Sequence, residues 1–528
     1  MSSLKFPSHE RGTPSFLSTA LPYVNAAPHV GHALEVVIGD AISRHLRQRG
    51  ADLRFTGGTD DHALKNVRAA RALGIEPRRL VETNGAVFRG LATKVGATFD
   101  DYLHTSSDPR HAPAVAELWK RCAERGDLYA KDYFGHYCSG CEAFLPAAEQ
   151  EGGLCPVHRA ALEETRERNW FFRLSRYEDA LLAELDSGRL RVLPEERARE
   201  VRSFVAGGLI DFSVSRGRTR ARNFGIGVPD DPSQVVYVWF DALANYLSLL
   251  GFPEPTEEFD RYWLRSSARE HLIGKDILRF HAVYWPAILL SAGLPLPTAI
   301  RVHGYVTVDG AKIGKSLGNT IDPFALVERR GTTALRYYLL RHLHTTKDGD
   351  FREERLIEAH DSELAGKLGN LLQRVTTLAS ACAGELELEP CEDEVDRELE
   401  KAARAAFDEV RTQVDAFALH AALEAIFELV SAANRYADAS APWRLAKRRD
   451  SEESADLRLR RVLANLCESL RVVAVLIAPF LPEAATRLLE RLGLPPEAPD
   501  YERARYGLGG PFRPRTGPPI LPRLRGTC

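Results

Sequence analysis

The order of apolar and polar positions divides the chain into segments with different secondary structure. From residue 15 to about residue 107, short apolar runs of strand length alternate with segments whose apolar residues recur at helical spacing. The predicted elements are strands at 15–20 and 52–58 and helices at 33–50, 67–73 and 80–95. This alternation predicts an α/β domain with a parallel, doubly wound sheet, whose ligands bind beyond the carboxyl ends of the strands.

A turn-rich segment follows, and the alternation then returns. Around Tyr129 the pattern becomes short and irregular, with strand-like runs at 170–174 and 210–215. From residue 234 onward strands and helices alternate again. The predicted elements are strands at 234–241, 270–276 and 301–308 and helices at 242–250 and 277–290.

Beyond Phe324 strand signals nearly vanish, and long helical periodicity predicts an α-helical bundle. Its helices are expected at 335–343, 362–379, 395–414, 416–437, 457–478 and 483–492. From Pro495 the chain is rich in Pro, Gly and Arg, which indicates a wrap or a loose tail.

Two histidines open the first predicted helix. Residues 21–32 read Leu-Pro-Tyr-Val-Asn-Ala-Ala-Pro-His-Val-Gly-His, so His29 and His32 lie at a helix N-terminus. Unpaired backbone N–H groups and the helix dipole favour an anion such as phosphate there, and Gly31 lets a nucleotide approach the backbone. Asp60, Asp61 and His62 follow the second strand and are expected to face the same crevice. The alternative is that the two histidines only cap the helix or fill the core.

Composition restricts the class of protein. A chain of 528 residues with 44% apolar content has room for two or more domains with their own cores. Without a run of about 18 apolar residues or an apolar signal segment, we expect a soluble, cytoplasmic protein with no membrane partner. The net charge of −3 argues against a uniformly basic surface, so any nucleic-acid contact must use local patches.

Three of the eight cysteines crowd into the turn-rich segment together with a histidine. Cys138 and Cys141, followed by Cys155 and His158, form two pairs with two-residue spacers, which can bind one Zn²⁺ tetrahedrally. Four protein ligands leave no open position for a substrate, so the predicted role is structural. The alternative is that these cysteines are free thiols.

A glycine-rich loop after the strand at 301–308 carries Lys312 and Lys315, with Ser316 beside the second lysine. Such a donor-rich loop suits a triphosphate, whose charge must be neutralised while pyrophosphate departs. As an isolated pattern, a solvated basic turn explains it equally well.

Taken in order, these segments resemble class I aminoacyl-tRNA synthetases, and within them the methionyl-tRNA synthetase family. Pro28-His-Val-Gly-His32 is similar to the HIGH motif, and Lys312-Ile-Gly-Lys-Ser316 to the KMSKS loop. The resemblance covers roughly residues 14 to 490 and includes Tyr237-Val-Trp-Phe-Asp-Ala-Leu-Ala-Asn-Tyr246, His271-Leu-Ile-Gly-Lys-Asp-Ile-Leu-Arg-Phe-His281, Gly369-Asn-Leu-Leu-Gln-Arg374 and Ala441-Pro-Trp443.

The resemblance implies ATP-dependent activation of L-methionine to methionyl-adenylate, followed by transfer to tRNA(Met). His29, Gly31, His32, Lys312, Lys315 and Ser316 would bind ATP, with the histidines and lysines catalytic and Mg²⁺ accompanying ATP. The methionine pocket would comprise Ala20, Leu21, Tyr23, Asp60, Trp239, Ala242, Tyr246, Ile277 and His281, with Asp60 suited to the ammonium group. Asn370, Arg374 and Trp443 would read the anticodon.

The resemblance also implies a domain order. The expected domains are a Rossmann-like catalytic domain at 14–118 and 233–325, a connective insertion with the zinc module at 119–232, a helical linker and anticodon-binding bundle at 326–492, and a tail at 493–528. Because no appended tRNA-binding domain is recognisable after the bundle, we expect a monomer.

Three departures from the family pattern leave alternatives open. Ile313 and Gly314 stand where the KMSKS loop usually has Met and Ser, Asp61-His62-Ala63 replaces Glu-His-Gly, and Asn223-Phe224-Gly225 replaces a tryptophan-containing segment. The alternatives are a specialised paralogue that activates a methionine-like amino acid, with or without tRNA charging, and a non-catalytic tRNA-binding protein.

Overall fold

The computed structural model describes residues 11–138, 143–145, 150, 152–156, 159, 161–313, 318–382, 384–391, 393–497 and 500–525. The chain forms two compact units. The first comprises Met1–Gly39, Asp52–Thr93 and Ala97–His303, and the second comprises Asp40–Ala51, Lys94–Gly96 and Gly304–Cys528, each as far as it is described. Among the described residues, no helix is both long and apolar enough to cross a membrane.

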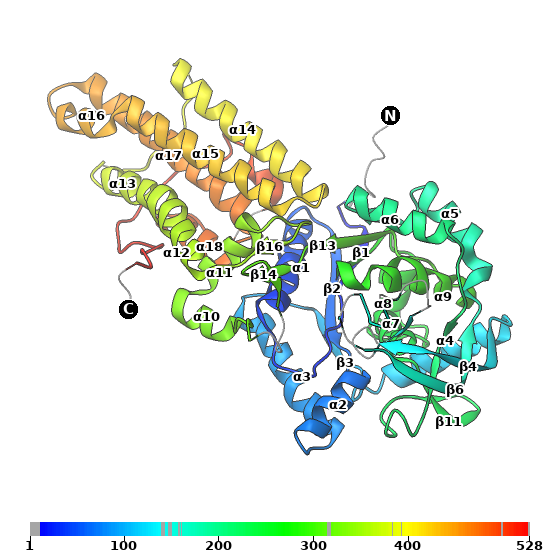
Figure 1. Ribbon diagram of the computed structural model, residues 1–528. Helices are drawn as coiled ribbons and strands as arrows, with labels where there is room; N and C mark the ends of the chain where they lie inside the picture. Colours follow the sequence, from blue (N-terminus) through cyan, green and yellow to red (C-terminus); the bar gives the residue numbers. More distant parts are fainter. Residues whose placement is uncertain are drawn as a thin grey trace. The chain divides into compact units, whose positions relative to one another are not determined.

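A six-stranded parallel sheet organises the first unit, in the order β3-β2-β1-β12-β13-β7 (Figure 1). Its strands are β1 Pro14–Thr19, β2 Asp52–Thr59, β3 Asp101–His104, β7 Arg191–Leu193, β12 Ala268–Gly274 and β13 Ala299–His303. Chain order runs outward from β1 through β2 to β3 on one side and from β12 to β13 on the other, where the earlier strand β7 adds at the edge, so β1 and β12 are the switch point of a doubly wound sheet. The predicted sheet is confirmed.

Helices connect these strands. The main ones are α1 Val30–Gln48, α2 Leu64–Ala72, α3 Pro77–Lys94, α4 His111–Glu124, α7 Val238–Ser248 and α9 Trp285–Ala292. The first begins three residues before the predicted position, directly after His29, because Val30 already packs its side chain into the core. The beginning of α1 therefore carries the histidine motif.

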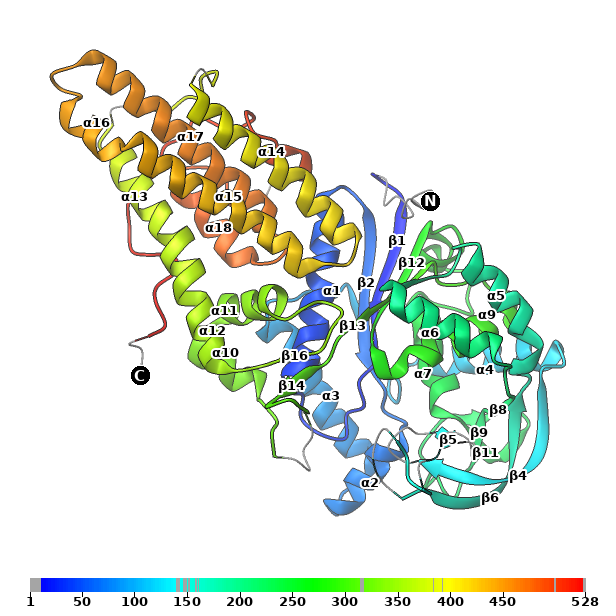
Figure 2. The same ribbon diagram turned by 45° about the horizontal axis from the view of Figure 1, so that its top comes forward.

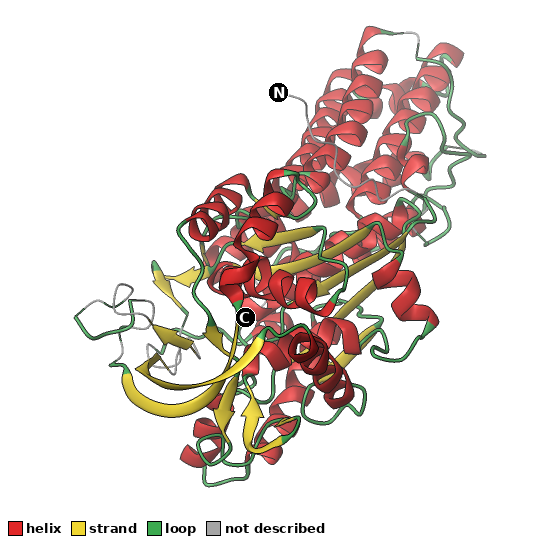
Figure 3. Cartoon of the chain, turned by 90° about the vertical axis from the view of Figure 1, so that its right-hand side faces the viewer, coloured by secondary structure: helices red, strands yellow, loops and turns green. Residues whose placement is uncertain are grey.

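The turn-rich segment is an antiparallel sheet with the strand order β5-β4-β6-β8. Its two longest strands, β4 Leu128–Cys138 and β6 Glu163–Phe172, curve together along their length (Figure 3). The remaining elements of this region are β5 Ala143–Leu145, α5 Glu178–Asp186, α6 Glu195–Ala206, β8 Phe212–Ser213, β9 Ser215–Gly217, β10 Gly227–Val228 and β11 Asp231–Val236.

The prediction of one strand over 234–241 is wrong in its second half. Strand β11 ends at Val236 and α7 begins at Val238, so Trp239 lies on a helix. All 11 residues of α7 are buried. A segment buried on every side carries no apolar period, and periodicity therefore cannot distinguish its helix from a strand.

The predicted strand at 301–308 is also wrong, because it is broken. Strand β13 ends at His303, and β14 (Val306–Val308) belongs to a separate three-stranded sheet with β15 (Ala311–Lys312) and β16 (Gly349–Asp350). Between the two strands, a Cβ on Gly304 would overlap the backbone carbonyl of Lys347. Glycine permits this close approach and lets the chain leave the sheet.

The single helix predicted at 277–290 is interrupted as well. A 3₁₀ turn covers Lys275–Ile277 and a π turn covers Phe280–Tyr284 before the regular helix α9. Pro286 lies at the start of α9, where its missing N–H costs no helical hydrogen bond. This irregular backbone positions Ile277 and His281.

The second unit contains the predicted helical bundle (Figure 2). Its helices are α10 Pro323–Arg330, α11 Thr332–Tyr337, α12 Glu353–Ala359, α13 Asn370–Ala379, α14 Glu394–Asp415, α15 Leu419–Ser440, α16 Pro442–Arg448, α17 Glu453–Ile477 and α18 Pro482–Arg491. The described part of the tail packs back against the second unit, because the backbone N–H groups of Leu524 and Arg525 donate to the Asp361 carboxylate.

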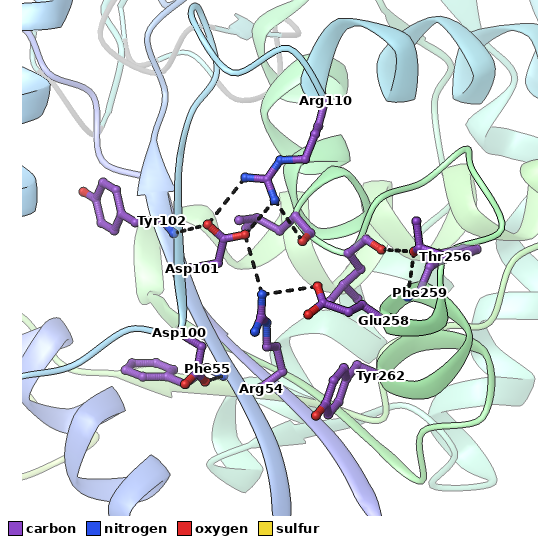
Figure 4. Close-up of polar contacts among 12 residues, drawn as sticks. Arg54, Phe55, Asp100, Asp101, Tyr102, Arg110, Thr256, Glu258, Phe259 and Tyr262 are labelled. Atoms are coloured by element: carbon purple, nitrogen blue, oxygen red, sulfur yellow. Dashed lines mark hydrogen bonds and ion pairs between the residues drawn. The ribbon is translucent and has the colours of Figure 1, made fainter.

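An ionic cluster ties the outer edge of the parallel sheet to neighbouring loops (Figure 4). Asp101 on β3 accepts from Arg110 at 2.7 Å and lies 3.8 Å from Arg54 on β2, which also contacts Glu258 at 3.2 Å. The cluster joins side chains from two strands and two connections, and we interpret it as structural.

Candidate active site

The two histidines of the first motif present matched donors at the start of α1. The Nδ1 atom of His32 accepts the backbone N–H of His29 at 3.1 Å, and the Nδ1 atom of His29 accepts the N–H of Gly31 at 3.1 Å. Since each Nδ1 is an acceptor, each ring carries its proton on Nε2. Burial and the neighbouring His29 hold the pKa of His32 well below its usual value of 6.5. The site therefore offers neutral Nε2–H donors beside a helix N-terminus.

Gly31 is required by the geometry of this pair. A Cβ at Gly31 would lie 2.9 Å from Cε1 of His29, and the two histidine rings are only 4.0 Å apart between centroids. A larger residue would push the His29 ring away from the N–H of residue 31. The sequence indicated close backbone approach at this glycine, and the neighbour that approaches is the histidine itself.

The predicted methionine-binding aromatic residues come together in the first unit. The ring centroids of Tyr23 and Trp239 are 6.2 Å apart, and those of Trp239 and His281 are also 6.2 Å apart. Tyr246 and His281 are 5.9 Å apart between centroids, and the tyrosine hydroxyl lies 2.8 Å from Nε2 of the histidine. These side chains form a buried aromatic cluster of the kind that accommodates an apolar ligand.

The smaller predicted residues surround this cluster. Ala20 and Ala242 are buried, and the carbonyl of Ile277 lies 3.0 Å from Nδ1 of His281. Leu21 packs over Gly58, where a Cβ would collide with it. Asp60 is 2% exposed, and its backbone forms a β-bridge with Tyr23, so this buried acidic residue is a backbone neighbour of the cluster.

Two further groups at this site were missed in the sequence. Phe280 stacks on Trp239 with ring centroids 3.8 Å apart and an angle of 8° between the planes. Buried Asp241 lies between two histidines, 2.7 Å from Nδ1 of His62 and 2.6 Å from Nε2 of His111. Although burial raises the pKa of Asp241, the two histidines lower it to about 2. Both residues stand in motifs already quoted, but only the fold reveals their partners.

The lysine loop is described only in part. Lys312 ends β15, and its Nζ lies 4.4 Å from the ring centroid of Tyr305. The Ile313 side chain is buried. Gly314, Lys315 and Ser316 lie outside the described residues.

Two of the four predicted zinc ligands are described. Cys138 and Cys155 are both buried and belong to one small cluster, against which Leu162 packs. Cys141 and His158 lie outside the described residues, and the part of the chain that is described contains no group of three or more potential metal ligands. Burial of two thiols in one cluster fits a Cys-rich metal site.

The predicted anticodon-reading residues lie on the bundle of the second unit. The Arg374 guanidinium is 5.1 Å from the ring centroid of Trp443, and it also contacts Asp438 at 3.1 Å. Asn370 is exposed at the start of α13, one turn before Arg374. Trp443 is 36% exposed, so one face of its ring can receive a base.

Two segments that depart from the family pattern, 61–63 and 223–225, contain residues that pack in the core. Phe224 packs against a small core of Val24, Val81 and Phe88, and its ring is edge-on to His62 at 5.1 Å between centroids. Ala63 is buried directly before α2. Phe224 thus joins a small core beside His62.

Comparison with known proteins agrees with this geometry. The family model described as tRNA synthetases class I (M) matches residues 15–164 and 155–376, and the model of the anticodon binding domain of methionyl tRNA ligase matches residues 389–504. The chain belongs to the methionyl-tRNA synthetase family of class I.

Relatives from several bacteria match over most of their length. The methionine–tRNA ligase of Mycobacterium leprae is 42% identical over 91% of this chain and 89% of its own, and that of Brucella suis is 40% identical over 91% and 92%. The structure of Mycobacterium tuberculosis methionyl-tRNA synthetase in complex with methionyl-adenylate has a TM-score of 0.92 at 39% identity. The structural match covers 97% of this chain and 100% of the mycobacterial one.

Proposed function

We propose that this protein is a methionine–tRNA ligase that activates L-methionine with ATP and transfers the methionyl group to tRNA(Met). The observation that carries the proposal is the aromatic cluster of Tyr23, Trp239, Tyr246 and His281, with the buried Asp60 bridged to Tyr23 through the backbone. An apolar, polarizable pocket suits a thioether, and a buried carboxylate suits the ammonium group. The mycobacterial relative of the same fold binds methionyl-adenylate, the expected intermediate.

Activation requires positioning and charge stabilisation, with no covalent enzyme nucleophile. The methionine carboxylate attacks the α-phosphate of ATP, and pyrophosphate leaves. His29 and His32 donate their Nε2–H groups to the phosphate, and Gly31 keeps the His29 ring in place. Lys312, Lys315 and Ser316 bind the triphosphate. Mg²⁺ enters with ATP and neutralises phosphate charge.

The amino acid is held by its side chain and its ammonium group. Ala20, Leu21, Ala242 and Ile277 complete the pocket around the aromatic side chains. The neutral state of His281, whose pKa burial lowers to about 4, keeps the pocket free of a positive charge that would repel an apolar side chain.

Amino-acid-dependent ATP–pyrophosphate exchange, followed by charging of initiator and elongator methionine tRNAs, tests this function. We expect exchange with methionine and charging of both tRNAs. Absence of exchange with every amino acid would indicate a non-catalytic tRNA-binding protein. Exchange without charging would indicate the specialised paralogue. The matches to the catalytic model and to the methionyl anticodon-binding domain, together with the methionine–tRNA ligases that resemble the chain over most of its length, favour the ligase over both alternatives.

A structural zinc ion bound by Cys138, Cys141, Cys155 and His158 is the second part of the proposal. The burial of Cys138 and Cys155 in one cluster supports it. We expect one zinc ion per chain by metal analysis of the purified protein and loss of that zinc in Cys138→Ser. Cys382→Ser is the matched control, since Cys382 lies on the helical bundle, and it should keep the metal. Equal zinc contents in the two variants would refute this ligand set.

Anticodon reading by Asn370, Arg374 and Trp443 predicts a separation of the two reaction steps. Replacing Trp443 by alanine removes the stacking surface for one base, worth about 1–3 kcal/mol. We expect tRNA charging efficiency to fall by about 5- to 150-fold while ATP–pyrophosphate exchange stays unchanged. Trp443→Phe keeps an aromatic face and should retain most of the charging. A parallel loss of exchange in Trp443→Ala would contradict this role.

A further inference from the structure

A set of polar side chains behind the aromatic cluster contacts Tyr246. Ser18 on β1 and His271 on β12 are register partners in the parallel sheet, and Oγ of the serine lies 2.7 Å from Nδ1 of the histidine. The His271 ring stacks on Tyr246 with centroids 4.0 Å apart. On its other nitrogen, Nε2, His271 is 3.2 Å from Nε1 of Trp285. All four side chains are at most 1% exposed.

The two ends of this network determine where its protons lie. The Trp285 indole can only donate, so Nε2 of His271 must be the acceptor. Burial and the nearby His281 hold the pKa of His271 well below its usual value, against a smaller opposing effect of Glu270, so the ring is neutral. Its one proton is therefore on Nδ1 and is donated to Ser18.

At the opposite end, the Ile277 carbonyl can only accept, so the Nδ1 proton of His281 points to it at 3.0 Å. The neutral His281 ring then has a lone pair on Nε2, and Tyr246 donates its hydroxyl proton there at 2.8 Å. Burial and the Glu35 carboxylate raise the pKa of Tyr246, so its hydroxyl keeps the proton that it donates to His281.

The hydrogen bonds form two directed sets: Trp285 donates to His271, which donates to Ser18, and Tyr246 donates to His281, which donates to the Ile277 carbonyl. Stacking of the His271 ring on Tyr246 joins the two sets. Reversing any member would leave a buried donor or acceptor without its partner, which is costly. The Tyr246 proton is consequently donated to His281. What the tyrosine can offer to an incoming side chain is a lone pair.

We propose that Ser18 and His271 are positioning residues for methionine: His271, which Ser18 holds by a hydrogen bond, keeps the ring of Tyr246 in the orientation that the amino acid requires. This inference rests on the proposed function. Ser18 holds the His271 ring, and His271 supports the flat face of the Tyr246 ring. Neither residue is among those assigned to the pocket above.

A double-mutant cycle separates this role from simple packing. Ser18→Ala should raise KM for methionine in ATP–pyrophosphate exchange by about 3- to 10-fold, the worth of one net hydrogen bond, with kcat and KM for ATP within about twofold. In a His271→Phe background, which keeps a flat ring but lacks the nitrogen that contacts Ser18, Ser18→Ala should change KM for methionine by less than about twofold. Ser15→Ala, a buried serine on the same strand, is the control and should leave KM unchanged.

Equal fold-changes from Ser18→Ala in both backgrounds would overturn the proposal, as would an unchanged KM for methionine in Ser18→Ala. If Ser18→Ala unfolds, Ser18→Cys keeps the size and a weaker hydrogen-bonding group, and its KM should lie between those of the wild type and the expected alanine value. Absence of methionine-dependent exchange in the wild-type protein would instead refute the proposed function, and with it this inference.

Discussion

Replacing His32 by alanine is expected to lower kcat for methionine-dependent ATP–pyrophosphate exchange by about 10²–10³-fold, the typical loss when one preorganised donor to a developing charge is removed. His32 is a neutral donor through Nε2 because the His29 backbone N–H occupies Nδ1. The donor is already oriented before ATP binds, so it acts without reorganisation in the transition state. Steady-state exchange over a range of ATP concentrations measures the effect.

A matched variant tests whether the Nε2–H group is responsible. In His32→Gln the terminal amide can place an N–H near the position of Nε2, so this variant should recover part of kcat. KM for methionine should stay within about twofold of the wild-type value in both variants, since His32 is outside the aromatic cluster. Equal activity of the alanine and glutamine variants would contradict the donor role.

Replacing Arg336 by methionine is expected to destabilise the second unit by about 3–5 kcal/mol, the usual cost of breaking a buried ion pair. Arg336 and Asp40 each have side chains 1% exposed and lie 2.7 Å apart. The guanidinium also donates to the backbone carbonyls of Val95 and Phe480. Methionine fills similar volume but removes the donor to these carbonyls and the buried cation that pairs with Asp40.

Calorimetry of the full-length protein measures this effect as a lower midpoint for the transition of the second unit. The control is Arg404→Met, because Arg404 pairs with Glu400 on the exposed face of α14 and its side chain is 67% exposed. Surface ion pairs of this kind contribute little to stability, so the unfolding midpoint of Arg404→Met should be close to that of the wild type. Equal midpoints for the two variants would show that the buried pair does not stabilise the unit.

The elements with clear periodicity were predictable, and the buried ones were not. Helix α14 was expected at 395–414 and lies at Glu394–Asp415, because one apolar stripe faces its neighbours along the whole length. Helix α7 was expected as strand in its first turn, since it is buried on every side. The break at Gly304 was missed because it depends on the close approach of Lys347, more than 40 residues later in the chain.

The residues of the candidate site were also predictable only where a local motif marks them. Local motifs identified His29, His32, Tyr23, Trp239, Tyr246 and His281, and the fold brings the segments that carry them together. Asp241 was quoted within a motif, but its position between His62 and His111 joins three distant segments. Local pattern contains no signal for such a pairing.

By itself, the sequence determined the family, the alternation that builds the parallel sheet, the bundle, and the residue types that the chemistry needs. These depend on short-range order: spacing along a strand or helix, and motifs a few residues long. The tertiary structure alone decided the protonation pattern, from the Nε2–H donors of the histidine pair to the directed hydrogen bonds that end at Ile277. The position of a proton depends on which group lies within about 3 Å, and packing brings those groups together from distant parts of the chain.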